Sequence, residues 1–325
     1  MSMKLGITVQ EDLPIEVHKR LARDAEAAGM GSMWAADALG RDPFILCQIW
    51  ADATKRMTVG TGIVQLLTRT PVQHAKAAAT LQESTEGRFA LGLGISTPAP
   101  MRQWHGVGFD RPLGATEDAL VLISSILRGE VSQHDGAVLS SHGFQLQYTP
   151  RPEPPPIYLG AMGPRAVALA GRHADGLLLS WQSPAAIASL VRRARDAAEK
   201  AGRPMPAVAS YVRFSVAATR DEAREALAKK FAFYWQFFSE KFVAQSPADS
   251  IVAVQRAYES GGAAALAEVV DDDILLRFGW YGTKSDDVSA FLRQFEDAGV
   301  EELIAAPLTL GDPLEAHHQV MAALS

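Results

Sequence analysis

The residues that could do chemistry in this sequence stand at the ends of apolar, strand-like segments. Asp37 follows Trp34-Ala35-Ala36. A carboxylate at the end of a buried strand must be paired or hydrogen bonded, so Asp37 could contact a cofactor or substrate, or cap the following turn. We favour the contact. His105, in a loop after a later strand-like segment, could exchange a proton near neutral pH or simply pack within its loop.

Glycine-rich segments end three of the predicted strands, at residues 62–65, 94–97 and 160–164. Glycine lets the backbone approach a flat ring or a phosphate group closely. At any single position a tight turn without a ligand is the simpler interpretation, but three such ends at one rim favour a binding site. Pro164 opens a predicted helix, whose N-terminus offers free N–H groups to an anion.

Common catalytic motifs are missing from the sequence. It has no HExxH, GxSxG or P-loop motif, and segment 92–97 departs from a dinucleotide fingerprint because Thr97 stands where the third glycine is needed. Asp271-Asp272-Asp273 is expected to begin a helix, and His317-His318 to face solvent, so we predict no metal site. With no metal, nucleophile or acid pair in view, an organic cofactor is expected to supply the reactive atom.

The composition is that of an ordinary globular protein. The 325 residues are 48% apolar and 21% charged, with a net charge of −6, which argues against nucleic-acid binding. No apolar run approaches the roughly 18 residues that cross a bilayer. The single cysteine, Cys47, lies in an apolar helical segment and is expected to be buried. We therefore expect a cytoplasmic protein that acts on a small molecule and binds neither nucleic acid nor a membrane.

Strand-like segments alternate with helical patterns at a steady interval. The first four begin at residues 4, 32, 58 and 88, which is typical of the βα units of a parallel sheet. Their apolar content is nearly continuous, as in strands buried on both faces. The pattern predicts eight strands, at residues 4–9, 32–36, 58–64, 88–94, 157–161, 176–180, 208–217 and 303–306.

Eight such units predict a (β/α)8 TIM barrel, a fold of typically about 250 residues whose active site lies at the C-terminal ends of the strands. We expect one domain over residues 1–325, with insertions after strands four and seven. A doubly wound sheet would need a glycine-rich loop after the first strand, and none is present. The predicted insertions are 95–113, a hairpin at 130–150 followed by a proline-rich connector from Arg151, and a less regular region at 236–280.

The order and spacing of these segments resemble the bacterial-luciferase-like monooxygenase superfamily. Within it, the chain is similar to oxidoreductases that depend on the deazaflavin coenzyme F420, such as methylenetetrahydromethanopterin reductase. The matching segments are 25–30, 34–37, 59–63, 69–71, 79–81, 86–94, 104–106, 156–164, 174–176 and 298–300.

The resemblance implies a homodimer, and a cofactor ring that lies over a bulge in the third strand. That bulge often contains a non-prolyl cis peptide, which by position is Gly62-Ile63. Asp37 matches the acid that contacts the deazaflavin ring. The other cofactor contacts implied here are Gly62, Ile63, Gln65, Gly94, Ser96, Thr97, Gly160, Ala161, Met162, Gly163, Pro164 and Ser180.

The chain departs from the sugar-phosphate dehydrogenase branch of this family. Ala38 stands where that branch has a histidine, and Thr97 where it has a catalytic glutamate, so we do not expect glucose 6-phosphate as substrate. Asp37 and His105 remain the candidate catalytic residues, His105 as proton donor. We expect an F420-dependent oxidoreductase that transfers a hydride to or from a small organic substrate. An FMN-dependent two-component monooxygenase and a non-catalytic ligand-binding barrel are the alternatives.

Overall fold

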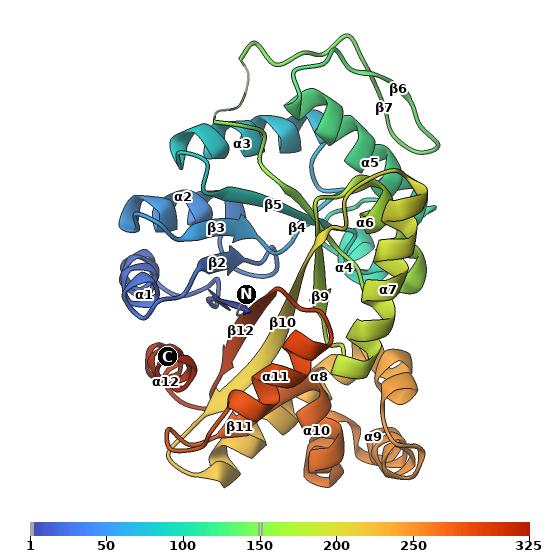
Figure 1. The fold of residues 1–325 in the computed structure, drawn as a ribbon. Helices are drawn as coiled ribbons and strands as arrows, with labels where there is room; N and C mark the ends of the chain where they lie inside the picture. The colour runs from blue at the N-terminus through green and yellow to red at the C-terminus, as the bar shows by residue number, and fades with distance from the viewer. Residues whose placement is uncertain (1–2, 149, 151) are drawn as a thin grey trace.

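Eight parallel strands close into a barrel in the computed structural model, which describes residues 3–148, 150 and 152–325 (Figure 1). The last barrel strand pairs with the first, in the register Lys4 opposite Glu302, so the ring is complete. The predicted (β/α)8 barrel is therefore confirmed. The barrel strands are β1 (Lys4–Thr8), β2 (Ser32–Ala35), β3 (Thr58–Thr61), β5 (Phe89–Gly94), β8 (Ile157–Gly160), β9 (Gly176–Ser180), β10 (Ala207–Val216) and β12 (Glu302–Leu308).

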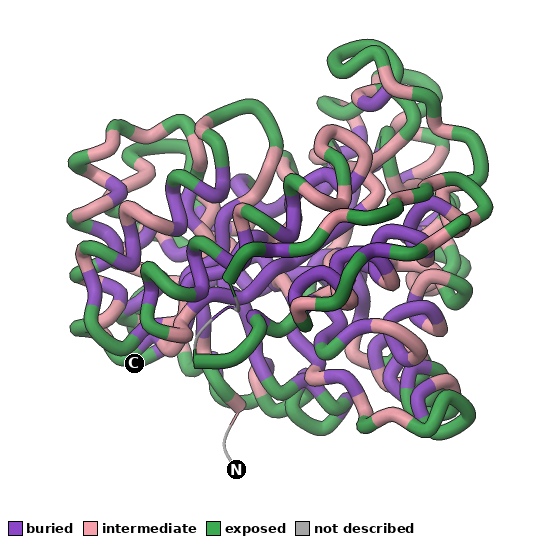
Figure 2. Tube along the Cα trace, turned by 90° about the horizontal axis from the view of Figure 1, so that it is seen from above, coloured by how far each residue is buried: buried purple, intermediate pink, exposed green. Residues whose placement is uncertain are grey.

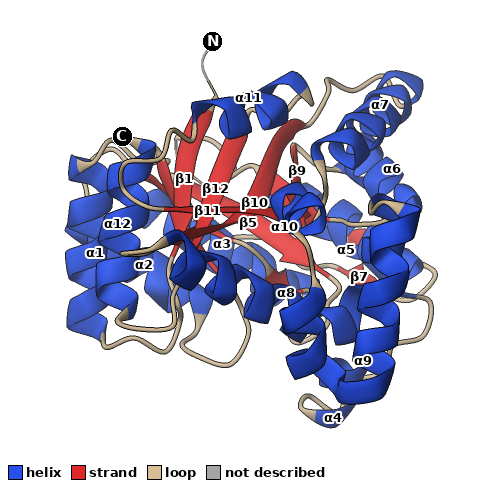
Figure 3. Cartoon of the chain, turned by 90° about the horizontal axis from the view of Figure 1, so that it is seen from below, coloured by secondary structure: helices blue, strands red, loops and turns tan. Residues whose placement is uncertain are grey.

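Helices surround these strands, as Figure 3 shows from one end of the barrel. Six of them begin with proline in the first turn, where its missing N–H costs no hydrogen bond. The covering helices are α1 (Ile15–Ala27), α2 (Pro43–Ala53), α3 (Pro71–Ser84), α5 (Pro112–Leu127), α6 (Pro164–His173), α7 (Pro184–Lys200), α8 (Arg220–Gln245), α11 (Ser289–Asp297) and α12 (Pro313–Leu324).

The loop after β5 and the hairpin after α5 are the insertions that follow the fourth barrel strand. The loop carries a short helix, α4 (Pro98–Gln103). The hairpin, β6 (Gln133–Asp135) and β7 (Ser140–His142), projects from one end of the molecule (Figure 1). The Asp118 carboxylate accepts hydrogen bonds from the N–H groups of its turn. The predicted connector begins at residue 151, outside the described residues, and its described part, 152–156, leads into β8 without helix or strand.

The insertion after β10 is more regular than the sequence suggests. Helix α8 continues through residue 236 with a kink at Phe238 and is followed by α9 (Ala248–Val269) and α10 (Asp272–Phe278). A further strand, β11 (Gly279–Gly282), pairs in parallel with the end of β10. The aromatic run at 231–238 divides between two roles: Phe231 and Trp235 are buried in the core under α8, and Phe233 and Phe237 are exposed.

Two further expectations need correction. The predicted strand at 58–64 is interrupted at Gly62-Ile63 and resumes as the short β4 (Val64–Gln65). His317 does not face solvent, because α12 packs it inward, where its Nδ1 lies 2.6 Å from the Pro313 carbonyl oxygen. Cys47, in contrast, is buried in α2 as expected, and burial raises the pKa of its thiol.

The barrel has an outer core under the helices and a smaller inner core. Buried segments gather at the centre and exposed ones at the rim (Figure 2). Inside the barrel, Trp34, Leu178 and Ile304 pack with Tyr158 and Tyr211. This inner packing closes the barrel below its C-terminal end and leaves the strand ends to carry the site. None of the helices among the described residues has the length and apolar character to span a bilayer.

Candidate functional site

A clamped bulge between β3 and β4 lies at the C-terminal mouth of the barrel. The peptide bond between Gly62 and Ile63 is cis, as the resemblance implies. Three hydrogen bonds hold it: Tyr211 Oη donates to the Gly62 carbonyl oxygen (2.9 Å), the Asp37 N–H to the Ile63 carbonyl oxygen (3.1 Å), and the Gly62 N–H to the Ala35 carbonyl oxygen (2.7 Å). The end of the neighbouring strand β2 and strand β10 across the barrel therefore fix this segment.

The side chain of Ile63 explains two of the glycines that the sequence assigns to ligand binding. A Cβ atom at Gly94 would lie 2.7 Å from Ile63 Cγ1, and one at Gly160 would lie 2.8 Å from Ile63 Cγ2. At Gly62, a Cβ atom would overlap the Tyr211 hydroxyl. These three glycines make room for the bulge itself, whereas sequence reasoning assigns that room to a ring or phosphate.

Asp37 and Gln65 join the two strands beside the bulge. The Gln65 N–H donates to Asp37 Oδ2 (3.1 Å), and Gln65 Nε2 donates to the Asp37 carbonyl oxygen (2.8 Å). Arg69 Nη1 lies 3.8 Å from the same Oδ2 atom. Gln65 Oε1 is buried and accepts no hydrogen bond from any described residue. The structure thus brings Asp37, Gln65 and the bulge together and leaves one buried acceptor unused.

The other predicted cofactor contacts lie in the loops after β5 and β8. Ser96 has a left-handed backbone conformation (φ +66°), and Thr97 precedes α4 without capping it through its side chain. After Ala161 and Met162, Gly163 begins α6.

The start of α6 has the features of an anion site. No side chain caps the helix at Gly163 or Pro164, and nothing described lies within 4 Å of a Cβ atom built on Gly163. The first N–H groups of an uncapped α-helix attract anions.

Ser180 ends β9, and its hydroxyl accepts a 2.8 Å hydrogen bond from Arg213 Nη1. Arg213 is a residue that sequence reasoning missed. It lies two positions after Tyr211 on β10, so both side chains point into the barrel. The sequence feature that could have identified it is a charged residue within a largely apolar predicted strand.

Glu11 is a second residue that sequence reasoning missed. It lies just past β1, and burial raises the pKa of its carboxyl group. The negative charges of Asp12 and Asp37 raise that pKa further, and Lys230 of α8 opposes them. A raised pKa makes a carboxyl group a candidate for proton transfer.

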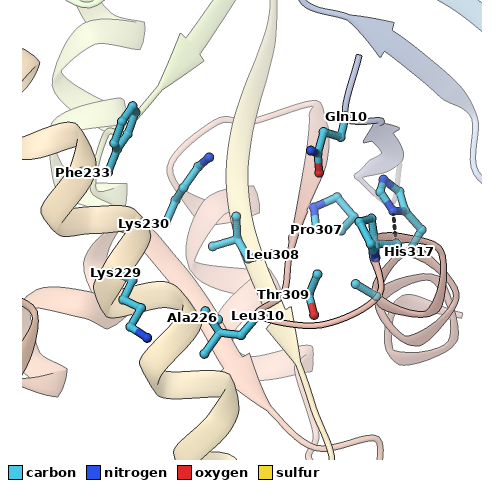
Figure 4. A pocket seen from close by; sticks show the side chains of 12 residues that line it. Gln10, Ala226, Lys229, Lys230, Phe233, Pro307, Leu308, Thr309, Leu310 and His317 are labelled. Atoms are coloured by element: carbon cyan, nitrogen blue, oxygen red, sulfur yellow. Dashed lines mark hydrogen bonds between the residues drawn. The ribbon is translucent and has the colours of Figure 1, made fainter. Parts of the chain in front are cut away.

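A cavity of about 250 Å³ is lined in part by Gln10, the residue before Glu11. It opens between the residues after β1, the end of β12 and α8. Gln10 and His317 lie on one side of it and Lys230 and Phe233 on the other (Figure 4). Its lining includes neither the bulge nor any of the predicted cofactor contacts.

His105 is exposed in the loop after α4. No hydrogen bond or ion pair joins it to Asp37, and its role as proton donor stays a prediction. No group of three potential metal ligands occurs among residues 3–148, 150 and 152–325.

Comparisons with known proteins agree with this architecture. A family model described as luciferase-like monooxygenase matches residues 3–302. The chain is 28% identical over 313 residues to 5,10-methylenetetrahydromethanopterin reductase of Methanolobus tindarius, covering 93% of this chain and 94% of that protein.

Two solved structures share the fold. The coenzyme F420-dependent tetrahydromethanopterin reductase of Methanopyrus kandleri has a TM-score of 0.84 at 23% identity, with 99% of this chain and 98% of the other covered. A monooxygenase of Streptomyces bottropensis has a TM-score of 0.74 at 20% identity, with 99% and 97% covered. The chain therefore belongs to the luciferase-like monooxygenase family and is an oxidoreductase.

Proposed function

We propose that this protein is a coenzyme F420-dependent oxidoreductase that transfers a hydride to or from a small organic substrate. The observation that carries the proposal is the bulge at Gly62-Ile63, clamped by Tyr211 and Asp37 at the mouth of the barrel. A relative that matches nearly the full chain is named as a methylenetetrahydromethanopterin reductase, and a structural neighbour is named as F420-dependent.

The residues at the mouth fit a deazaflavin. Gln65 Oε1 is a buried acceptor without a described partner, and a ring that carries an N–H group would satisfy it. The peptide of Gly62 and Ile63 would support the ring, with Asp37 beside it. When bound, the deazaflavin would supply the carbon that accepts or donates the hydride.

The loops would hold the rest of the cofactor. The uncapped N-terminus of α6, after Ala161 and Met162, would bind an anionic tail through Gly163 and the N–H groups that follow Pro164. Gly94, Ser96 and Thr97 would border the ring from the loop after β5, and Gly160 and Ser180 from the next two strands.

Glu11, which lies just past β1, is an additional candidate proton donor in this arrangement. Burial raises the pKa of its carboxyl group, so it keeps its proton to a higher pH than an ordinary glutamate. His105 stays the alternative, and it would have to reach the mouth from its exposed loop. Substituting each residue separately distinguishes the two.

Equilibrium titration with F420 and, separately, with FMN tests the proposal. We expect F420 to bind and FMN not to bind at comparable concentrations. Tight FMN binding without F420 binding would instead support a flavin monooxygenase, for which the structural neighbour from Streptomyces bottropensis is a precedent in fold. Binding of neither would favour a non-catalytic barrel. The homodimer and the cytoplasmic location stay predictions.

A further inference from the structure

Arg213 is a buried cation without a partner carboxylate among the described residues. The residue is 9% exposed, and burial lowers the pKa of its guanidinium group. The groups that oppose this lowering are the two tyrosines Tyr234 and Tyr211, and no Asp or Glu of the described residues contributes. Because an unpaired buried charge is costly, such groups in proteins are normally paired or serve a site.

The strand register places Arg213 nearer to the mouth of the barrel than Tyr211, the residue that clamps the bulge. Tyr211, which bonds to Gly62, lies level with Ser180 on one neighbouring strand and Ile304 on the other. Arg213 is two residues farther along β10, level with Ala306, which moves it about 6.6 Å toward the mouth on the same face. Arg213 therefore starts closer to the C-terminal end of the barrel, the end that carries active sites in this fold, than the residue that clamps the bulge.

Two aromatic rings fix the plane of the guanidinium group. Its Cζ atom lies 4.2 Å from the Trp181 ring centroid and 5.6 Å from that of Tyr234. Trp181 is itself buried and has a left-handed backbone conformation (φ +55°), which a large side chain adopts only where its surroundings impose it. The Arg213 side chain is thus held in place by stacking and by Ser180.

The stacking leaves hydrogen-bond donors of Arg213 available. A guanidinium group has five N–H donors, and Arg213 has two side-chain hydrogen-bond partners, Ser180 Oγ through Nη1 and Tyr234, which do not use all five. A fixed planar donor fork of this kind matches the two oxygens of a carboxylate or phosphate.

The other cations near the mouth differ from Arg213 because they face carboxylates. Arg69 contacts both Asp37 and Asp42. Lys230 lowers the pKa of Glu11, and its Nζ atom lies 5.5 Å from the Tyr234 ring centroid. Arg213 alone of these three has no described counter-charge.

We propose that Arg213, oriented by Ser180, Trp181 and Tyr234, binds an oxyanion of the organic substrate, either a carboxylate or a phosphate. The inference rests on the proposed function only in placing the cofactor ring below this group. It narrows the substrate class to compounds that carry an anionic group beside the carbon that gains or loses the hydride.

Calorimetric titration of the F420-loaded protein with benzoate, and with inorganic phosphate, tests the proposal, with benzamide as the neutral match of benzoate. We expect at least one anion to bind in the millimolar range and benzamide to bind at least tenfold more weakly. Arg213→Gln should weaken anion binding at least tenfold, which is about 1.4 kcal/mol. Arg213→Lys keeps the charge and loses the planar fork, so its anion affinity should lie between those of the wild type and Arg213→Gln.

A matched control substitutes an arginine that is already paired. Arg203 forms an ion pair with Asp175 (3.1 Å), so Arg203→Gln should leave anion binding unchanged. Thermal unfolding of each variant shows whether it is folded. If Arg213→Gln is unstable, Arg213→Lys and Ser180→Ala supply the comparison, because both keep a cation at the site.

Three results would overturn the proposal. The first is unchanged anion binding by a folded Arg213→Gln protein, and the second is no binding of either anion by the wild type. The third is a tenfold loss of F420 affinity in Arg213→Gln with unchanged affinity for a deazaflavin that lacks the anionic tail, which would assign Arg213 to the cofactor. Failure of F420 to bind the wild type would contradict the proposed function instead. Titration of the cofactor-free protein with the same anions would then still test whether Arg213 binds them.

Discussion

The hydroxyl group of Tyr211 donates a 2.9 Å hydrogen bond to the carbonyl oxygen of Gly62, which is 149 positions earlier in the chain. This bond joins the seventh barrel strand to the bulge after the third, across the inside of the barrel. It fits only because residue 62 has no Cβ atom. One contact thus connects the inner core to the segment that we propose supports the cofactor.

Replacing Tyr211 by phenylalanine should destabilise the protein by about 1–3 kcal/mol, because the Gly62 carbonyl oxygen loses its buried donor while the ring packing is kept. The free energy of unfolding in urea measures this change. Tyr148 is an exposed tyrosine whose hydroxyl lies 3.0 Å from Thr80 Oγ1, so Tyr148→Phe is the control and should change stability by less than about 0.5 kcal/mol. Equal effects of both substitutions would argue against the clamp.

Gly94→Ala should destabilise the fold by about 1–3 kcal/mol through overpacking, because the new methyl group would press on the branched side chain of Ile63. Gly163→Ala serves as the matched substitution, since open space surrounds that position and its backbone angles suit any residue. Chemical denaturation should give a lower free energy of unfolding for Gly94→Ala than for Gly163→Ala. A Gly94→Ala protein as stable as the wild type would show that the bulge can shift.

Acid should destabilise the protein through its buried histidines. Burial lowers the pKa of His74 from 6.5 to about 4, and lowers those of His18 and His317 as well. Because the unfolded chain binds the proton first, the stability due to neutral His74 is complete above pH 6.5 and is lost as the pH falls toward 4. The loss for His74 is about 3 kcal/mol.

Urea denaturation across this pH range measures the effect. In His74→Gln the decline of stability with acid should be shallower than in the wild type. An identical decline in both proteins would exclude His74 as a cause.

Glu11 should show the opposite dependence on pH. Its pKa is raised above 4.5 by burial, so its contribution to stability is complete below pH 4.5 and is lost as the pH rises through the folded-state value. Glu11→Gln, which stays neutral, should gain stability relative to the wild type as the pH increases. A constant difference between the two proteins would mean that Glu11 titrates normally and is poorly suited to donate a proton.

The sequence predicts the barrel well because its evidence is local. The barrel strands are nearly continuous in apolar content, and the βα interval is regular over the first four of them. The inserted region after β10 lacks such a pattern, and its helices are stabilised by contacts among aromatic residues of α8 and α10. Its regularity therefore could not be read from spacing.

The site was predictable where it follows strand ends and not where it depends on register. Asp37 and Gln65 stand at strand ends and do meet beside the bulge. Tyr211 and Arg213 lie within a strand, and only the closed barrel places them opposite Gly62 and at the mouth. The sequence also could not distinguish glycines that face a ligand from those that face Ile63.

The most direct test of this account is a crystal structure of the protein with F420 bound. We predict that the deazaflavin ring lies against the peptide of Gly62 and Ile63, with Gln65 Oε1 accepting a hydrogen bond from the ring and the tail at the start of α6. A ring bound elsewhere, or FMN at that position with no affinity for F420, would contradict the account.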